Sequence, residues 1–259
     1  MRPMAPGANE SKAPCGDVRF SSDRRNPTVS FDLTSDTRVD DMTEHEKRQS
    51  IIDYCLEMNR CGLNQGTSGN ISLRHEQGML ISPSGIGYEE MKPEEIVFVD
   101  RDGQAHGDLN PSSEWRFHLA ILRHREAFNA VVHTHPTYAT ALAMCRRDIP
   151  AAHYMVAAAG GETIPCARYE TFGTDDLSHS VLEALTDRRA CLMANHGMIA
   201  CGDSLSRAMW LAVEVETLAR QYVIAESIGS PHILDHQEMT RVIEKFKDYG
   251  RQPNRQTSH

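Results

Sequence analysis

The segment NAVVHTH (residues 129–135) places two histidines one residue apart at the end of an apolar run. A short apolar run with β-branched residues is typical of a buried strand, in which residues i and i+2 point to the same face. His133 and His135 would then emerge side by side in an apolar interior, where a polar group without a partner is costly. The fold must therefore bring partners for both imidazoles to this strand.

The other segments alternate between strand patterns and helix patterns. Strands are predicted at 70–74, 78–82, 95–100, 163–169, 190–196 and 198–201, and helices at 47–62, 112–125, 136–145, 174–187, 204–229 and 236–250. Thr43 and Glu46 have the spacing of a capping box before the first helix. Hairpin-like runs of strands, with no linker that splits them, predict one α/β domain with a largely antiparallel or mixed sheet.

The two ends of the chain have a different composition from the rest. Residues 1–41 are rich in Ser, Pro, Asp, Arg and Gly, which predicts a disordered extension with at most one short strand at 29–33. Residues 251–259 form a polar tail. The predicted domain therefore covers residues 42–250.

Charge and cysteine usage exclude several classes of protein. The net charge of −9 argues against a nucleic-acid partner, and no apolar run approaches the length of a membrane span. The seven cysteines are odd in number and form no C-x-x-C pair, which is typical of a reduced, cytoplasmic protein rather than a disulfide framework.

A third histidine completes a candidate metal site. A catalytic zinc usually takes three protein ligands, so His133 and His135 need another. His196 ends the apolar segment ACLMANHG, and the following Gly197 permits a close approach of the backbone. The alternative is a set of satisfied core histidines, but a His-x-His pair together with a strand-end histidine favours a metal.

Three loops have the composition of anion sites without a cationic side chain. GLNQGTSGNIS (62–72) and SPSGIG (82–87) are rich in Gly, Ser, Thr and Asn, and PSSEW (111–115) places hydroxyls at a predicted helix N-terminus. Nests of backbone N–H groups and helix N-termini bind phosphate, although each loop taken alone is more often an ordinary turn or cap. Glu114, in the first turn of that helix, is either a general base beside the metal or a residue that complements the helix dipole.

Taken together, these blocks resemble the class II aldolase/adducin family from about residue 46 to residue 250. The resemblance is carried by GLNQGTSGNISLR, GMLISPSGI, PSSEWRFHLA, NAVVHTH, IPAAHYMVAAAGG, IPCARYETFGT, NHGMIACG and EKFKDYG, in fixed order. It implies a single α/β domain with a central, mainly antiparallel sheet flanked by helices. It also implies a homotetramer with active sites between subunits and one Zn²⁺ per subunit.

The resemblance assigns a role to each candidate site residue. His133, His135 and His196 match the zinc ligands, and Glu114 matches the catalytic acid/base, which also reaches the resting zinc. The positions that match the substrate phosphate site are Asn70, Ser84, Gly85, Ser112 and Ser113.

Further aromatic residues match positions at the aldehyde end of the substrate. Tyr154 matches a tyrosine that reaches a neighbouring subunit's site and handles the aldehyde oxygen, Tyr249 matches a C-terminal tyrosine near that site, and Phe172 lines the aldehyde pocket. Asn195 is smaller than the residue expected before the zinc-binding His196, a difference that bears on aldehyde preference.

The activity that the resemblance implies is cleavage of a small phosphorylated sugar, L-fuculose 1-phosphate or a similar deoxyketose 1-phosphate. The products are dihydroxyacetone phosphate and a short aldehyde such as L-lactaldehyde. A pentulose-5-phosphate 4-epimerase, or a related sugar-phosphate decarboxylase or dehydratase, would retain the same histidines. A non-catalytic, adducin-like cytoskeletal scaffold would be expected to have lost them.

Overall fold

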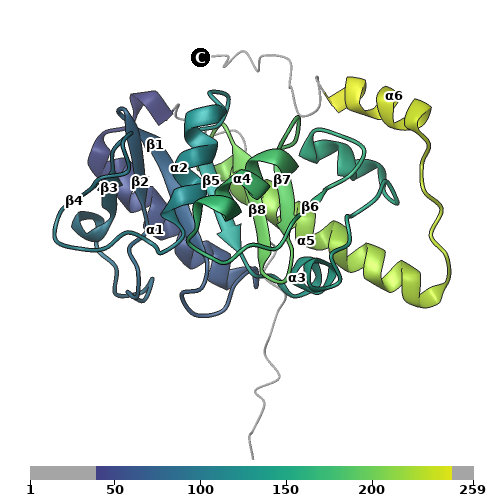
Figure 1. The fold of residues 1–259 in the computed structure, drawn as a ribbon, viewed down its shortest axis with the longest axis horizontal. Helices are drawn as coiled ribbons and strands as arrows, with labels where there is room; N and C mark the ends of the chain where they lie inside the picture. Colours follow the sequence, from purple (N-terminus) through teal and green to yellow (C-terminus); the bar gives the residue numbers. More distant parts are fainter. Residues whose placement is uncertain (1–38, 247–259) are drawn as a thin grey trace, which may run out of the picture.

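One eight-stranded sheet organises the molecule, and the computed structural model describes residues 39–246 of it (Figure 1). The strand order is β4-β3-β2-β1-β5-β8-β7-β6, and only β6 runs parallel to its neighbour, β7. The mainly antiparallel sheet predicted from the sequence is thereby confirmed. The strands are β1 (Asn70–His75), β2 (Gly78–Ile81), β3 (Val97–Val99), β4 (Ala105–His106), β5 (Ala130–Thr134), β6 (Cys166–Ala167), β7 (Ala190–Met193) and β8 (Gly197–Gly202).

Helices cover both faces of the sheet. In Figure 1, α2 and α4 lie together in front of the sheet, and α1, α3 and α5 pack on its other face. The α-helices are α1 (Glu44–Arg60), α2 (Trp115–His124), α3 (Thr137–Met144), α4 (Asp175–Ala184), α5 (Leu205–Ile228) and α6 (His236–Phe246). Short 3-10 turns are η1 (Val39–Asp41), η2 (Pro93–Glu95) and η3 (Tyr154–Ala159). Helix α6 stands apart at the end of an extended connection and contacts η3.

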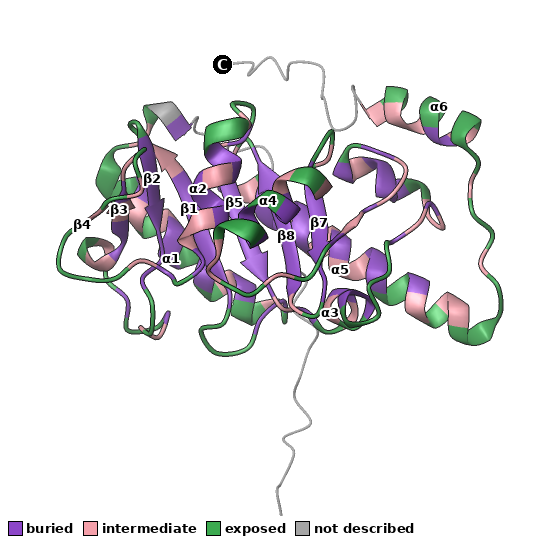
Figure 2. Ribbon diagram, in the orientation of Figure 1, coloured by how far each residue is buried: buried purple, intermediate pink, exposed green. Residues whose placement is uncertain are grey.

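The period of two along each strand separates two apolar cores. In β5, Val132 packs in the core under α1, α3 and α5, whereas Val131 packs in the core under α2 and α4. His133, two residues after Val131, points to the α2 side of the sheet. Because both faces of the sheet are covered, β2, β5, β7 and β8 are buried throughout, and β1 is buried except at its last two residues (Figure 2).

Local signals in the sequence explain where helices begin. Thr43 and Glu46 form the predicted capping box, with Glu46 N–H donating to Thr43 Oγ1 and Thr43 N–H donating to the Glu46 carboxylate. Thr174 and Ser204 cap α4 and α5 through their side-chain oxygens. Gly62, just after α1, has a φ of 77°, the left-handed conformation that ends many helices.

Several predictions concern residues outside the described range. The strand at 29–33, most of the extension at 1–41, the tail at 251–259 and Tyr249 all lie there. Val39, at the edge of that extension, is buried in the core with α1. Within residues 39–246, no helix is both long enough and apolar enough to cross a bilayer.

Candidate metal centre and active site

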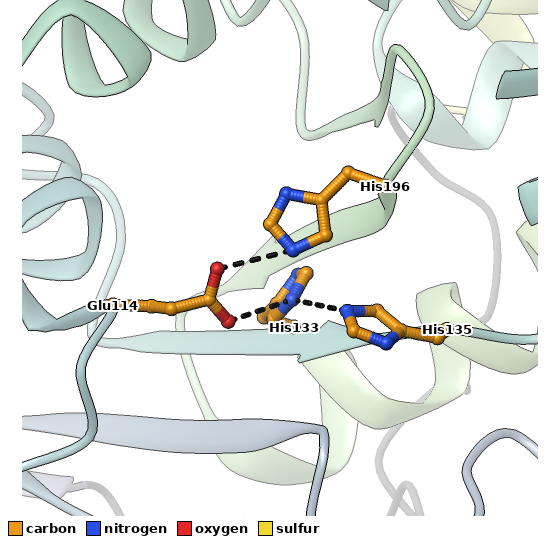
Figure 3. A group of neighbouring side chains, drawn as sticks. All are labelled: Glu114, His133, His135 and His196. Atoms are coloured by element: carbon orange, nitrogen blue, oxygen red, sulfur yellow. Dashed lines mark hydrogen bonds and ion pairs between the residues drawn. The ribbon is translucent and has the colours of Figure 1, made fainter. Parts of the chain in front are cut away.

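Four side chains from distant parts of the sequence point toward one another at the end of β5 (Figure 3). They are Glu114, His133, His135 and His196, and one potential ligand atom of each lies within 4.8 Å of those of the others. Glu114 immediately precedes α2, His133 lies in β5, and His135 follows that strand. His196 lies in the turn between β7 and β8. The structure therefore brings together the complete set of predicted metal ligands.

Strand pairing explains why His196 reaches the other histidines. β8 runs antiparallel to β5, with His133 opposite Ile199 and Thr134 opposite Met198, so the turn before β8 falls beside His135. Gly197 makes this approach possible. A Cβ atom there would lie 2.5 Å from His135 Cδ2 and 2.6 Å from Thr134 O, closer than real side chains allow. This confirms the predicted close approach at Gly197.

A backbone hydrogen bond orients His133 toward the centre of the cluster. Its Nδ1–H donates to the carbonyl oxygen of Met198 over 2.9 Å, which leaves the lone pair on Nε2. That Nε2 lies 2.9 Å from His135 Nε2 and 3.0 Å from Glu114 Oε2. This is the arrangement of a metal-ligating histidine whose second nitrogen is held by a backbone carbonyl.

Glu114 is a buried carboxylate among imidazoles. Burial by itself would raise its pKa, but the neighbouring His133 and His196 hold the pKa well below its ordinary value. Its Oε1 atom is buried and accepts no well-formed hydrogen bond, although His196 Nε2 lies 3.1 Å away. The side chain was expected in the first turn of the helix, and it occupies the position just before that turn.

The converging atoms fit a bound divalent cation. In neutral His133 the Nε2 lone pair faces a carboxylate oxygen, so the two acceptors need a cation between them, either a proton or a metal ion. Burial is the largest cause that lowers the pKa of His135 to about 3, so this ring stays neutral near pH 7. A metal ion satisfies all of these acceptors at once, and three imidazoles with one carboxylate form a donor set suited to zinc.

The predicted phosphate loops lie beside each other near Glu114. An isolated bridge joins Pro83 to Pro111, so that the loop containing Ser84 and Gly85 pairs with the segment that leads to Ser112 and Ser113. Among the described residues, neither the backbone N–H of Gly85 nor that of Ser113 has a hydrogen-bond partner. Gly85 has a φ of 76°, in the left-handed region where nests of N–H groups form.

Asn70, the fifth predicted phosphate residue, has a different environment. Its side chain is buried, and its Nδ2 donates to Glu114 Oε2 over 3.1 Å. Its Oδ1 lies 2.6 Å from His118 Nε2. Asn70 thus links the anion loops to the carboxylate of the metal cluster.

Two predicted aromatic residues are not part of the four-residue cluster. Tyr154 is 48% exposed at the start of η3, where its ring packs against His153 and Phe246. Phe172 is 64% exposed and precedes Gly173, whose backbone packs closely on Ser113 O. The structure therefore places Phe172 near the phosphate loops, whereas Tyr154 lies by α6.

Asn195 has a conformational reason to be small. Its φ is 55°, the left-handed region in which Asn is favoured over bulkier residues. Its side-chain Oδ1 accepts a hydrogen bond from Arg146 Nε over 3.2 Å. The tight turn into Gly197 explains the residue type at this position.

His118 and Ser72 form part of the site, but they were not predicted to do so. Ser72 lies two residues after Asn70 on β1, and His118 lies four residues after Glu114, so each shares a face with a predicted site residue. His118 is fully buried and bonds to both Asn70 and Ser72. The spacing was visible in NIS and EWRFH, but the pairing depends on how α2 packs on the sheet over β2 and β5, on either side of β1.

Comparison with known proteins agrees with this geometry. A model of the class II aldolase and adducin N-terminal domain matches residues 49–223. The chain belongs to the class II aldolase and adducin family. The matched residues lie within the predicted domain of 42–250, whose exact boundaries remain a prediction.

Similar proteins narrow the position of the chain within the family. The L-fuculose phosphate aldolase of Escherichia coli K12 is 51% identical over 81% of this chain and 98% of its own length. A 5-methylthioribulose-1-phosphate/5-deoxyribulose-1-phosphate aldolase of Rhodospirillum rubrum is also 51% identical, over 78% and 92%. A solved L-fuculose 1-phosphate aldolase superposes with a TM-score of 0.77 at 40% identity, covering 80% of this chain and 98% of that one. The predicted aldolase class of enzyme, an aldehyde-lyase, is confirmed.

Proposed function

We propose that this protein is a zinc-dependent aldolase that cleaves a deoxyketose 1-phosphate between C3 and C4. The products would be dihydroxyacetone phosphate and a short aldehyde, with L-fuculose 1-phosphate and L-lactaldehyde as the first candidates. The observation that carries the proposal is the buried Glu114 carboxylate, whose oxygens face His133 and His196 at 3.0 Å and 3.1 Å. A buried carboxylate beside imidazole nitrogens can serve as a base next to a bound metal ion, and the reaction needs such a pair of base and Lewis acid.

Cleavage leaves the enediolate of dihydroxyacetone phosphate, and this anion is the costly species. Zinc held by the three histidines would supply positive charge to its oxygens. Glu114 would protonate the enediolate carbon on cleavage, and would remove that proton in the direction of condensation. Its lowered pKa leaves it ionised in the resting site, so in condensation it can remove the proton from carbon directly. In cleavage it would first take up a proton from solvent, which balances the proton that leaves the C4 hydroxyl, and then deliver it to the enediolate carbon.

The anion loops account for a phosphorylated substrate. The N–H groups of Gly85 and Ser113, together with the hydroxyls of Ser84, Ser112 and Ser113, would hold the phosphate without any lysine or arginine. Asn70 would connect this subsite to Glu114. Binding energy from the phosphate would then place the reacting carbons against the carboxylate.

Tyr154 would take the proton from the C4 hydroxyl on cleavage and return it to the aldehyde oxygen on condensation. Because it lies by α6 and outside the ligand cluster, we propose that it acts in the site of a neighbouring subunit of a homotetramer. Phe172 and Tyr249 would line the aldehyde pocket. The reduced cysteine pattern supports a cytoplasmic location.

A 5-deoxypentulose 1-phosphate is the second candidate substrate. The observation that favours it is the equal identity, 51%, to relatives named for L-fuculose phosphate and for 5-methylthioribulose or 5-deoxyribulose phosphate. All three sugars present C1 phosphate and a keto group at C2, so they would share the metal and phosphate subsites. They differ in the aldehyde half.

A substrate panel tests the proposal. The purified protein, with its zinc content measured, is incubated with L-fuculose 1-phosphate, 5-deoxyribulose 1-phosphate, 5-methylthioribulose 1-phosphate and ribulose 5-phosphate. Release of dihydroxyacetone phosphate from one of the first three supports the aldolase and ranks its substrates. Isomerisation of the 5-phosphate without free aldehyde would instead identify an epimerase.

The role of Glu114 is tested separately by exchange of solvent hydrogen into dihydroxyacetone phosphate, which needs no aldehyde. Glu114→Gln should slow this exchange by about 10²–10⁴-fold, the usual contribution of general acid–base catalysis. Glu89→Gln, at an exposed carboxylate, serves as the matched control. Exchange at the wild-type rate in Glu114→Gln would exclude Glu114 as the base.

A further inference from the structure

His118 lies behind Glu114 and is fully buried within α2. A buried imidazole is costly unless its nitrogens have partners. Both nitrogens of His118 have one: Nδ1 lies 2.8 Å from Ser72 Oγ, and Nε2 lies 2.6 Å from Asn70 Oδ1. The ring therefore bridges β1 to the helix that follows Glu114.

The direction of every hydrogen bond in this bridge is determined by the carboxylate at its end. Ionised Glu114 can only accept, so Asn70 turns its Nδ2 donor toward Glu114 Oε2, at 3.1 Å. Asn70 Oδ1 is then the acceptor that faces His118, and His118 must carry its proton on Nε2. The free Nδ1 lone pair accepts the Ser72 hydroxyl proton, so all groups in the chain are satisfied.

The ring is held in this neutral form. Burial lowers the pKa of His118 to about 3. A protonated ring would also present a donor to the Ser72 hydroxyl and break the order of the chain. His118 is thus suited to fixing a geometry and not to moving protons.

This order distinguishes the two oxygens of Glu114. Oε2 is held by Asn70 and lies beside His133, whereas Oε1 accepts no well-formed hydrogen bond. The bridge therefore fixes the rotation of the carboxylate plane and leaves one oxygen available. Proton transfer to carbon requires such a fixed direction of approach.

We propose that His118 is a positioning residue for the aldolase reaction: through the Asn70 amide it sets the orientation of the Glu114 carboxylate, with Ser72 as its anchor. The inference rests on the proposed function, in which Glu114 is the acid/base. His118 acts only through Asn70. Its loss should therefore lower kcat while leaving KM and zinc content nearly unchanged.

Two substitutions separate this role from simple packing. In His118→Gln, the amide nitrogen reaches the position of Nε2 and can donate to Asn70 Oδ1. In His118→Asn, the shorter amide reaches only the position of Nδ1, so it can bond to Ser72 but not to Asn70. Both variants place a neutral amide in the same buried site.

We expect His118→Gln to keep kcat within a few-fold of wild type, and His118→Asn to lose about 10–100-fold, the usual cost of removing a group that orients a metal-site side chain. Thermal unfolding of both variants controls for stability. Equal kcat in the two variants, or a loss that follows the drop in Tm, would overturn the positioning role.

A spectroscopic readout does not depend on activity. In the zinc-loaded protein labelled with ¹⁵N-histidine, long-range ¹H–¹⁵N spectra should contain one neutral ring with its proton on Nε2, unchanged from about pH 6 to 9. Its signals should be absent in His118→Gln. An Nδ1–H tautomer at His118 would overturn the proposed order of hydrogen bonds.

The two measurements also separate the inference from the proposed function. Wild-type protein that releases no dihydroxyacetone phosphate from the sugar panel and catalyses no hydrogen exchange would refute the function, while the spectra still test the bridge. Active wild-type protein with a fully active His118→Asn variant would refute only the role of His118.

Discussion

The four-residue cluster and the surface around Tyr154 differ in how much of each region is enclosed within a single chain. The cluster is enclosed by β5, β8 and the start of α2, and His133 and Glu114 are buried. Tyr154 is half exposed, and its ring packs on Phe246 of α6. Helix α6 follows an extended segment and lies apart from the sheet (Figure 1). A single chain thus brings together all four candidate metal ligands, whereas the role proposed for Tyr154 would involve a second copy of the chain.

Loss of a metal ligand should give the largest effect and leave the Tyr154 region intact. His133→Ala removes a ligand that β5 and the Met198 carbonyl hold in place, so bound zinc should fall and activity should drop by about 10³-fold or more, because the metal contributes several kcal/mol to the transition state. Zinc content and kcat are measured together. His179→Ala, at an exposed histidine of α4, is the control. Full activity after complete zinc removal would eliminate the metal hypothesis.

Substitution of Tyr154 should separate the two regions. Tyr154→Phe removes the group proposed to take the C4 hydroxyl proton, so cleavage of the sugar phosphate should slow by about 10²–10⁴-fold while zinc content stays at the wild-type level. Hydrogen exchange into dihydroxyacetone phosphate, which involves no aldehyde, should be much less affected. Tyr169→Phe provides an exposed control. Equal losses in cleavage and exchange would show that Tyr154 does not act at the aldehyde.

Adding one methyl group at Gly197 should weaken zinc binding by the histidine cluster. Gly197→Ala adds a Cβ atom that meets His135 and Thr134 O, so the imidazole must move and zinc affinity should fall by about 10–100-fold. Gly229→Ala is a matched control, because nothing lies within 4 Å of that added Cβ. The check is a zinc competition titration. Unchanged affinity in Gly197→Ala would mean that the turn is less constrained than the packing indicates.

Mixing two inactive variants gives the smallest but most direct signal of shared sites. Glu114→Gln and Tyr154→Phe subunits that exchange within one oligomer should restore about a quarter of wild-type activity, if each site combines Glu114 of one chain with Tyr154 of another. The recovery is followed after subunit exchange, with each variant alone as the control. No recovery in verified mixed oligomers would place both residues in the same subunit's site.

The sequence predicted the parts of the site that depend on local periodicity. The strand period of two put His133 and His135 on one edge, and the apolar run before Gly197 placed His196 at a strand end. The capping box and the mainly antiparallel sheet were likewise confirmed. The roles of the remaining residues were proposed from family resemblance and await the measurements above.

Only the tertiary structure decided which groups meet across the sheet. His118 and Asn70 are 48 residues apart, and their hydrogen bond exists because α2 packs on β2 and β5, the two strands that flank β1. Asn195 has a left-handed backbone conformation, and the sequence alone did not indicate that this position requires one. The sequence indicates the hydrophobic period of each element and which residues share a face. Contacts between elements depend on how the elements pack. The two histidines of NAVVHTH therefore meet Glu114 only when α2 has packed on the sheet.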